Sequence, residues 1–500
     1  MVLFVVKCVL TLLFSVVMYY VWLIVTKPRV VWFAMSQKGW WIPLLPFLGN
    51  AYTAIFTGLK INMLSTLLWA ERYVGMPVNF WFGSKYHYMS KSADDARIVL
   101  NHSKCLNKAE LYGDIQYVFK NSILLIPGEI WKGRRRYLRS AFNTNMINTF
   151  MPTFNQQSCA LIDLINKKKP EDDHYKFFNT HAFMSFFLTS IGWMAEDIKD
   201  SDISEFAYYV DKSQDEFVKL LANPAVPGWL WMRSPLGAKL TFNIKDMKRI
   251  LKNILKKKMA QMAKHKEYVE NTTELPLVEL LLNEGYECKD RESDVFQEFT
   301  LFSAAATDTT GHTLTFIFTL LGMFPDIQQN VYEEVMTVVG DREIDDVLLS
   351  KLMYTEAVIN EAMRIFPSIP LVGRYCSEDI ELTDKILPKG TNISCSIFHI
   401  QRNPEYWANP LEFDPSRFLP ENSGKIKPGS FLPFSIGPRN CIGQRMATVL
   451  TKITVATVLR HFKISSKHKD IKEFKLISCI SMKTRNHLDL HFTPRNENEE

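Results

Sequence analysis

Cysteine is scarce in this chain. Eight cysteines among 500 residues are too few for a disulfide scaffold, and no two of them form a C-x-x-C pair that would suggest a structural zinc or dithiol site. These counts favour a reducing compartment. The chain also contains no G-x-G-x-x-G and no H-E-x-x-H segment, so nothing in it points to a nicotinamide or flavin fold.

The overall composition has no extreme. Hydrophobic residues make up 47% and charged residues 22% of the sequence, which excludes a wholly disordered or collagen-like chain. The excess of basic over acidic residues, 59 against 53, gives a net charge of only +6. That balance fits contact with an acidic partner or a membrane surface, and it equally fits an ordinary solvated surface. Aromatic residues reach 13%, which suits a large apolar interior or pocket.

The amino terminus carries one long uncharged run. Between Lys7 and Lys27 lie the 19 residues Cys8–Thr26, rich in Val, Leu, Phe and Tyr. As a helix they would extend over roughly 28 Å, about the thickness of the hydrocarbon layer of a bilayer. A cleaved signal peptide is the alternative, but the run is longer than a usual signal core and no small-x-small cleavage site follows it. We therefore expect a transmembrane signal-anchor over residues 1–26.

The charges that flank this run predict its orientation. Lys27, Arg29 and Lys38 follow it, so the positive-inside rule leaves the bulk of the chain on the cytosolic face. Three glycosylation sequons are then expected to carry no glycan, and they begin at Asn101, Asn271 and Asn392.

The remaining chain divides into a connector and one large domain. Residues 27–50 form an aromatic and proline-rich connector, suited to a membrane interface, and residues 51–500 show no internal repeat or long linker. Helical patterns dominate up to about residue 366, short strand-like runs such as Ile393–Ile397 follow, and a helix returns at about Gln444–Phe462. The lysine-rich segment Lys245–Lys266 is interpreted as a solvated amphipathic helix rather than a nucleic-acid site. The predicted fold class is mainly α with small β-sheets.

The segment Phe299–Pro325 predicts a long helix through the core. It carries one carboxylate, Asp308, and seven threonines among 27 residues, a poor match to membrane hydrocarbon. A lone buried carboxylate needs a reason, because desolvating it unpaired costs several kcal/mol. Asp308 could cap a local kink or pair with a distant Arg. Alternatively, Asp308 and the neighbouring Thr309 could pass protons inward from solvent.

One cysteine lies between two glycines in the turn Phe434–Gly443, which leads into a helix. Glycines let the backbone curl around the Cys441 sulfur, and amides near a helix N-terminus favour a thiolate. Arg439 supplies a cation and Phe434 could shield the sulfur from water. A small buried cysteine in a tight turn is the plain alternative, and the spacing argues against it.

This turn matches F-x-x-G-x-R-x-C-x-G and resembles the signature of the cytochrome P-450 haem-thiolate family. Further segments resemble family motifs in the family's order, and the chain is most similar to its animal microsomal family-four branch, which includes insect enzymes. These segments are Trp131 to Arg135, Ala305–Thr310, Glu361 to Arg364, Gly373-Arg374, Pro404–Tyr406, Phe413–Phe418 and Pro438–Gln444.

The resemblance implies a cytochrome P-450 fold over residues 51–500 and a haem b cofactor with Cys441 as its axial thiolate and metal ligand. The implied cofactor-binding residues are Trp131, Arg135, Arg374, Phe434, Arg439 and Cys441, and the implied catalytic residues are Asp308 and Thr309. Glu361, Arg364 and Arg417 are implied to form a buried structural charge network.

The implied reaction inserts one atom of O2 into a hydrophobic substrate: a fatty acid, a hormone-like lipid or a xenobiotic such as an insecticide. The electrons would come from NADPH through a membrane-bound reductase, with cytochrome b5 as a further donor and with no nucleic acid as a partner. The basic side chains of Lys132, Arg136 and Arg139 could meet the reductase, or could simply form a solvated face. The implied location is the endoplasmic reticulum membrane.

Several positions depart from the family-four pattern. Ala305 replaces a Glu that can esterify haem, so the haem is expected to be non-covalent. Ala306 replaces the usual Gly, and Gln401 the usual His, which weakens any transfer of fatty-acid specificity. A haem-thiolate isomerase or dehydratase is an alternative that Thr309 argues against. A membrane-tethered haem- or lipid-binding protein without turnover is another, which would have little use for Asp308 and Thr309 together.

Overall fold

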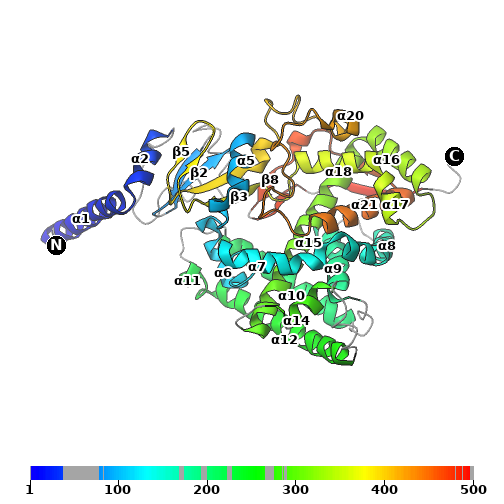
Figure 1. The fold of residues 1–500 in the computed structure, drawn as a ribbon, viewed down its shortest axis with the longest axis horizontal. Coiled ribbons are helices and arrows are strands. Elements are labelled where there is room, and N and C mark those ends of the chain that lie inside the picture. Colours follow the sequence, from blue (N-terminus) through cyan, green and yellow to red (C-terminus); the bar gives the residue numbers. More distant parts are fainter. Residues whose placement is uncertain are drawn as a thin grey trace.

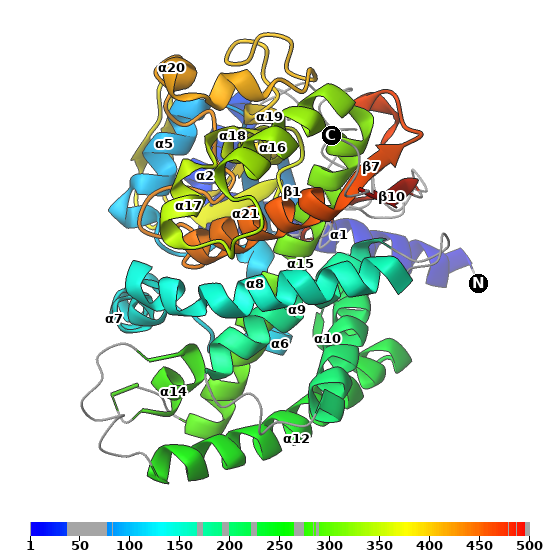
Figure 2. The ribbon, with the colours of Figure 1, turned by 90° about the vertical axis from the view of Figure 1, so that its right-hand side faces the viewer.

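A computed structural model describes the chain over residues 2–37, 78–82, 84–167, 174–192, 200–221, 228–264, 275–283, 285–286, 290–478, 480–486 and 488–495. Helices dominate these residues, and the strands form four small sheets among them (Figures 1 and 2). The predicted fold class, mainly α with small β-sheets, is confirmed. No disulfide joins the six cysteines that lie in the described ranges.

The helices lie as follows: α1 (Val2–Thr26), α2 (Pro28–Ser36), α5 (Ala93–Asn101), α6 (Gln116–Phe119), α7 (Gly128–Leu138), α8 (Thr144–Lys167), α9 (His174–Ile191), α10 (Asp200–Leu221), α11 (Gly228–Trp231), α12 (Pro235–Lys264), α14 (Leu277–Leu282), α15 (Arg291–Met323), α16 (Pro325–Val338), α17 (Asp346–Lys351), α18 (Met353–Ile365), α19 (Ile397–Ile400), α20 (Pro420–Ser423) and α21 (Gln444–His461). The strands are β1 (Val78–Phe82), β2 (Lys85–Ser90), β3 (Leu371–Tyr375), β4 (Ile380–Glu381), β5 (Ile386–Leu387), β6 (Asn392–Ser396), β7 (Phe462–Ser466), β8 (Leu476–Ser478), β9 (Met482–Thr484) and β10 (Leu490–Pro494).

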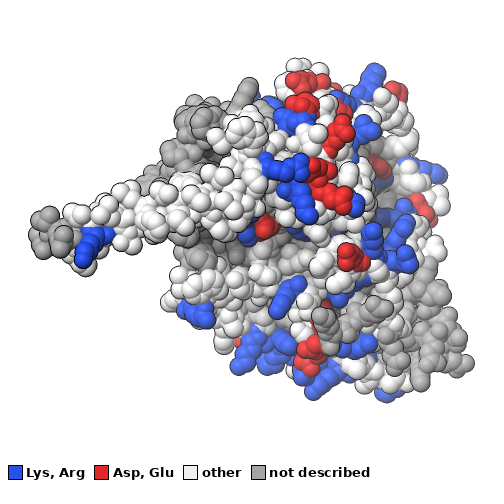
Figure 3. Space-filling view, turned by 60° about the vertical axis from the view of Figure 1, so that its left-hand side comes forward, with Lys and Arg blue, Asp and Glu red and all other residues white. Residues whose placement is uncertain are grey.

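Helix α1 projects away from the body, and its surface is almost free of charge (Figures 1 and 3). Its segment Phe4–Thr26 is long and apolar enough to cross a membrane, with a mean hydropathy of 2.4. After Lys27 the chain turns into α2, where Val30 and Ala34 are buried. The Lys27 ammonium donates to the Ser84 carbonyl at 2.9 Å, so α2 is fixed to the sheet end of the body. The rest of the predicted connector, residues 38–50, lies outside the described residues.

The largest sheet has the order β1-β2-β6-β3. Strands β1 and β2 form an antiparallel hairpin, β2 pairs with β6 in parallel, and β3 pairs with β6 antiparallel. The sequence pattern located β6 within one residue but gave no strand before residue 366. Helices do dominate that part of the chain, and the local pattern did not predict β1 and β2, because these strands join the sheet through a partner roughly 300 residues further along the chain.

The predicted core helix is α15, and it runs unbroken from Arg291 to Met323. The Asp290 side chain caps its start by accepting the Ser293 N–H at 3.2 Å, eight residues before the predicted start. The helix ends before Pro325, which begins α16 at a position where no amide hydrogen is needed.

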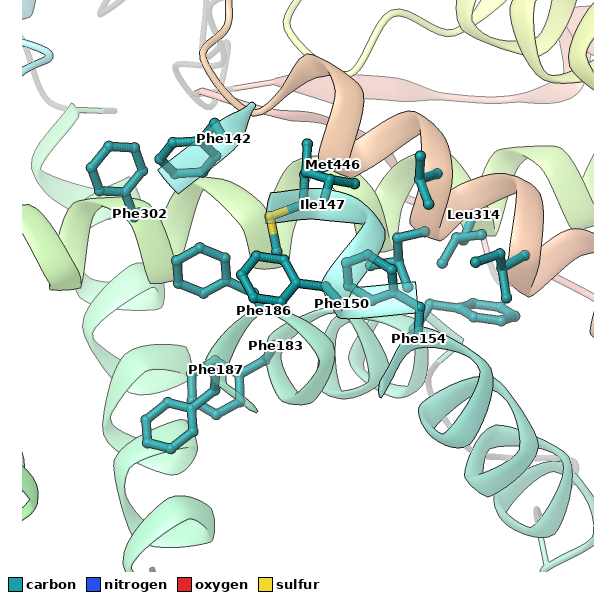
Figure 4. Close-up of a cluster of buried hydrophobic side chains, with 14 of the residues drawn as sticks. Phe142, Ile147, Phe150, Phe154, Phe183, Phe186, Phe187, Phe302, Leu314 and Met446 are labelled. Carbon is teal, nitrogen blue, oxygen red and sulfur yellow. The ribbon is translucent and has the colours of Figure 1, made fainter. Parts of the chain in front are cut away.

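Helix α9 packs closely on α15. A Cβ added at Gly311 would lie 2.0 Å from the Asn179 Oδ1 and 2.8 Å from the Asn179 backbone. Only glycine therefore allows this approach. Around the contact, phenylalanines from α8, α9 and α15 and Met446 of α21 form one apolar cluster (Figure 4).

Two further expectations concern charged segments. The lysine-rich segment is confirmed as an amphipathic helix, α12, which buries Met247, Ile250 and Ile254 and whose described part ends at Lys264. The buried charge network is also confirmed, since both carboxylate oxygens of Glu361 bind Arg364, and the Arg417 Nε lies 3.5 Å from Glu361 Oε1.

Candidate functional site

The turn around Cys441 is closed by its own backbone. The Cys441 N–H donates to the Phe434 carbonyl at 3.0 Å, and the Asn440 N–H donates to the Gly437 carbonyl at 3.1 Å. Helix α21 begins directly afterwards at Gln444. The cysteine is thus held between a tight loop and a helix N-terminus, as the sequence pattern predicted.

Gly437 is required by this loop for two reasons. Its φ is +77°, a left-handed conformation that side chains disfavour. A Cβ at this position would also lie 2.1 Å from the Leu100 carbonyl oxygen. The loop therefore rests directly on the end of α5, and no larger residue fits there.

The Cys441 side chain is accessible although it lies among buried elements. Desolvation raises the pKa of its thiol, while the Gly443 N–H and the positive charges of Arg135 and Lys108 act in the opposite direction. A metal ion would complete the shift toward the thiolate, because the thiolate is the form that binds metals. The surroundings of Cys441 therefore supply both access and compensating positive charge.

Arg439 is almost fully used by the protein itself. It donates from Nε to the Leu106 carbonyl at 3.0 Å, from Nη1 to Ile123 at 3.0 Å and from Nη2 to Ile126 at 2.7 Å. Its guanidinium also lies over the Trp131 ring, 4.4 Å from the centroid. Burial, followed by repulsion from neighbouring arginines, lowers its pKa to about 9. Its predicted contact with haem stays a prediction, with these three carbonyls as additional partners.

Arg374 differs from Arg439 in how few of its donor groups are hydrogen-bonded within the described residues. It is 1% exposed and donates from Nη1 to the Gly373 carbonyl, yet its Nε and Nη2 have no hydrogen-bond partner among the described residues. Burial lowers its pKa. Unpaired buried donors on a charged group are costly, so Arg374 is suited to receive an anionic group.

Lys108 is a cation at this site that the sequence did not reveal. Residues 107 and 108 run beside β3. The Tyr375 N–H donates to the Asn107 carbonyl, and the backbone of Lys108 forms an isolated antiparallel β-bridge with that of Arg374. Burial, then repulsion from Arg374 and Arg439, lowers the pKa of Lys108 well below its ordinary value, whereas Cys441 acts to raise it. No local motif surrounds Lys108, so only the folded loop could have revealed it.

Arg135 and Trp131 come from one helix, α7. Arg135 is half-buried and donates to the Asn440 side chain at 2.9 Å, and burial lowers its pKa. Trp131 is buried beneath Arg439. The structure thus brings Trp131, Arg135, Arg374, Arg439 and Cys441 together.

The middle of α15 is the part of this helix where burial is interrupted. Ala305 is exposed, and Ala306, Asp308 and Thr309 are half-buried. Figure 4 places Met446, in the first turn of α21, between Phe302 and Leu314 along α15. The beginning of α21, and with it the cysteine loop, therefore faces this stretch.

Asp308 does not cap a kink, and two neutral groups donate hydrogen bonds to its carboxylate. It accepts from the Asn179 amide at 3.2 Å and from the Ser481 hydroxyl at 3.3 Å, and α15 is continuous around it. The Thr309 hydroxyl donates to the Ala305 carbonyl at 2.7 Å. Asn179 of α9 and Ser481 of the β8–β9 turn thus help to orient Asp308.

Gln401, one of the departures from the family pattern, is fully buried. Its amide donates to the carbonyls of Met363 and Arg364, and its oxygen accepts the Leu432 N–H at 2.7 Å. Gln401 therefore joins the end of α18 to the segment that leads into the cysteine loop.

These residues fit a haem group on two observations. An accessible sulfur lies at a helix start, and four cationic side chains lie around it, of which Arg374 and Arg439 are buried and Lys108 and Arg135 half-buried. The charge of Arg374 lowers the pKa of both Lys108 and Arg439. Arg374 adds two donors without a partner among the described residues. A thiolate ligand for iron and cations for two carboxylates are what haem needs.

Comparison with known proteins agrees with this fit. The sequence profile of the cytochrome P450 family matches residues 42–488. Cytochrome P450 4V2 of Homo sapiens is 29% identical over 459 residues, covering 86% of this chain and 85% of that protein. Probable cytochrome P450 4ac3 of Drosophila melanogaster is 28% identical over 429 residues, covering 83% and 82%. Cytochrome P450 4c21 of Blattella germanica is 27% identical over 459 residues, covering 88% and 91%.

The predicted resemblance, down to the family-four branch, is confirmed by these relatives. Because the profile spans far more than half of the chain, this protein belongs to the cytochrome P450 family and is a haem-dependent monooxygenase.

Proposed function

We propose that Cys441 is the axial thiolate of the haem iron and that Lys108, Arg135, Arg374 and Arg439 compensate the haem carboxylates. The observation that carries this proposal is the meeting of an accessible sulfur with buried and half-buried cations, of which Arg374 has two donors without a partner in the part of the chain that the structure describes. When bound, haem with a thiolate ligand supplies O–O cleavage and transfer of one oxygen atom to substrate.

The carbon-monoxide difference spectrum of the reduced protein tests this assignment, because a sulfur ligand changes that spectrum characteristically. Cys441→Ser should abolish the thiolate-type band, whereas Cys105→Ser, at a buried cysteine outside the turn, should retain it. A Cys441→Ser protein with an unaltered band would refute the assignment.

Asp308 and Thr309 are proposed to move protons. The Asp308 carboxylate is half-buried, so it can exchange a proton with water, and Asn179 and Ser481 keep its oxygens in place. The Thr309 hydroxyl is one residue further along α15 and donates to the Ala305 carbonyl of the same helix, so its oxygen can still accept a hydrogen bond.

The haem is proposed to be held without a covalent bond. Ala305 has no carboxyl group with which to form an ester, although its position on α15 is exposed. Acidified organic solvent should therefore extract the pigment completely. Pigment that stays with the protein would contradict this proposal.

NADPH–cytochrome reductase is the proposed electron donor, with cytochrome b5 as a second one. Lys132 and Arg136 on α7 and Arg139 just after it are exposed and recur at helical spacing, and no ion pair to them is found in the described ranges. Replacing all three by Glu should slow reduction of the haem while leaving its absorbance spectrum intact. Unchanged reduction would exclude this face as the docking site.

We further propose that residues 1–26 anchor the protein in the endoplasmic reticulum membrane with residues 51–500 in the cytosol as the catalytic domain. Trp229, Leu230 and Phe242 are exposed apolar side chains on α11 and α12, and α11 lies on the side of the body that faces α1 (Figure 1). Such a patch suits contact with membrane lipid. Deleting residues 1–26 should reduce the fraction of the protein that sediments with membranes, and the additional change Trp229→Ser should reduce it further.

The substrate is proposed to be a hydrophobic molecule such as a fatty acid, a hormone-like lipid or a xenobiotic. The exposed Ala305 and the half-buried Ala306, on the stretch of α15 that the cysteine loop faces, present apolar side chains there and so support an apolar ligand class. NADPH consumption with reductase, measured across these three classes, identifies the class. Consumption without any oxygenated product would favour the binding protein, and turnover of peroxides without NADPH would favour the isomerase or dehydratase.

A further inference from the structure

The main chain of Ile123 lies between α15 and the cysteine loop. Its N–H donates to Glu298 Oε1 at 2.8 Å, and its carbonyl accepts from Arg439 Nη1 at 3.0 Å. Arg439 precedes Cys441 by two residues. A buried carboxylate on α15 is therefore connected to the cysteine loop through one residue.

Glu298 gathers donors from three separate parts of the chain. Its Oε1 accepts from Ile123, from Arg134 Nη1 on α7 at 3.0 Å and from the Tyr286 hydroxyl at 3.3 Å. The Glu298 side chain has no exposed surface and Arg134 has 10%. Arg134 also donates to the Asn121 carbonyl, so both ends of the segment 121–123 are held by the same ion pair.

A buried ion pair by itself is weak evidence of a stabilising role, because desolvation offsets most of the attraction. What distinguishes this pair is where its hydrogen bonds go. They hold Asn121 and Ile123, and the Ile126 N–H donates back to the Ser122 carbonyl at 3.2 Å, so the segment 121–126 is held as one turn. The carbonyls of Ile123 and Ile126 in that segment accept two of the three Arg439 hydrogen bonds. The pair thus holds in place two of the carbonyl groups that bind Arg439.

We propose that Glu298 is a positioning residue for the haem-binding loop. It fixes the segment 121–126, the segment fixes Arg439, and Arg439 fixes the backbone that carries Cys441. The proposal rests on the proposed role of Cys441 as haem ligand. Outer groups that orient metal ligands change metal affinity or activity by about 10- to 100-fold when they are removed.

Gln297 offers a matched control. Its Oε1 accepts the Asn121 N–H at 2.8 Å, which is the same kind of bond from the same helix to the same segment. The Asn121 carbonyl, however, binds Arg134 and not Arg439. Loss of the Gln297 bond should weaken the segment without touching the groups that receive Arg439.

The test uses four full-length variants purified with haem: Glu298→Leu, Glu298→Asp, Glu298→Gln and Gln297→Leu. Three readouts are taken, which are the rate of haem transfer to apomyoglobin, the thiolate-type band of the reduced carbon-monoxide complex, and the melting temperature. The Gln variant keeps an oxygen acceptor for Ile123. The Asp variant keeps a carboxyl group and withdraws the acceptor by one methylene.

Glu298→Leu should transfer haem at least about tenfold faster than the parent and lose part of the thiolate-type band. Glu298→Asp should change both in the same direction but less, and Glu298→Gln should stay within about twofold of the parent. Gln297→Leu should lower the melting temperature while leaving haem transfer and the band unchanged.

Two results would overturn the proposal: parent-like haem transfer in both the Leu and Asp variants, or an equal acceleration in Gln297→Leu. If the Leu variant fails to fold, the Asp variant alone decides between these outcomes. A parent protein without the thiolate-type band would instead refute the proposed role of Cys441, so the two failures are distinguishable.

Discussion

Arg364 binds both carboxylate oxygens of Glu361, with its Nε 2.6 Å from Oε2 and its Nη2 2.7 Å from Oε1, and neither side chain has any exposed surface. Arg364 also donates to the carbonyls of Gln401, Pro410 and Glu412. The ion pair therefore fixes the end of α18 to the chain that approaches the cysteine loop.

Replacement of Arg364 by Leu should be strongly destabilising. It leaves the Glu361 carboxylate buried with Arg417 at 3.5 Å and the Asp414 N–H as its remaining partners among the described residues, and breaking a buried pair in this way costs about 3–5 kcal/mol. Denaturant unfolding and haem content, measured together, check the expectation. Arg445→Leu, at the exposed pair with Asp346, is the control and should change stability little. Comparable losses in both variants would contradict the special role of burial.

The cysteine loop should not tolerate a methyl group at Gly437. Gly437→Ala places a Cβ 2.1 Å from the Leu100 carbonyl oxygen at a φ of +77°, so the loop must shift away from α5. We expect a protein with low haem content. The control is Gly424→Ala, where nothing lies within 4 Å and φ is −67°. Haem content measured from the Soret absorbance distinguishes them, and full loading of Gly437→Ala would show that the loop can relax.

Asp308→Asn should slow turnover without disturbing haem. The amide keeps the size of the side chain but cannot carry the proton, and loss of a positioned acid or base typically costs about 10²-fold or more. Oxygen consumption with reductase and NADPH gives the rate, and the carbon-monoxide spectrum gives the state of the site. Ser481→Ala removes a neutral donor to the Asp308 carboxylate and should have a smaller effect. An unchanged rate in Asp308→Asn would remove this residue from the reaction.

Glu298 should give the stability a specific pH dependence. Burial raises the pKa of this carboxyl from 4.5 to about 7, against the Ile123 N–H and Arg134, which lower it. The folded protein therefore keeps the proton up to about pH 7, while the unfolded chain releases it near pH 4.5. Glu298 thus makes the free energy of unfolding fall by up to about 3 kcal/mol as the pH rises through this window.

Glu298→Gln, neutral at every pH, removes this decline. Relative to the parent, the variant should become steadily more stable between about pH 4.5 and pH 7 and then level off. Buried histidines such as His181 and His312, with pKa values lowered by burial to about 4 and about 3, act in the opposite direction but are common to both proteins. Urea unfolding of parent and variant across this range is the measurement. A constant difference would exclude the titration.

Glycosylation tests the membrane orientation at one position only. Of the three sequons, Asn392 is completely buried in β6 and Asn271 lies outside the described residues, whereas Asn101 is exposed at the end of α5. We expect no mass change on glycosidase treatment of protein made in animal cells. A sequon in a tag added before α1 should be modified in the same cells. A glycan on Asn101 would reverse the proposed topology.

Short motifs could be predicted from the sequence because their residues are close along the chain. Glu361 and Arg364 lie one helical turn apart, and the spacing around Cys441 specifies a tight loop before a helix. Glycine at 437 follows from the same local pattern. In these cases the sequence contains both partners of each contact.

Contacts between distant segments could not be predicted in this way. Lys108 reaches the site because residues 107 and 108 lie beside β3, and Asp308 finds its donors in α9 and in the β8–β9 turn. The helix pattern of α15 was recognised, but the buried Glu298 near its start falls before the predicted boundary and was missed. Neither short spacing nor periodicity carries such information.

The two hydrogen bonds by which Ile123 connects Glu298 to Arg439 use only the amide hydrogen and the carbonyl oxygen of its backbone. Nineteen of the twenty amino acids carry both groups, so substitutions at position 123 can accumulate among relatives while the bridge survives, with proline as the exception. A search for invariant side chains would pass over this position. A proline there would remove the hydrogen bond to Glu298, and with it this connection between α15 and the cysteine loop, without altering any functional side chain.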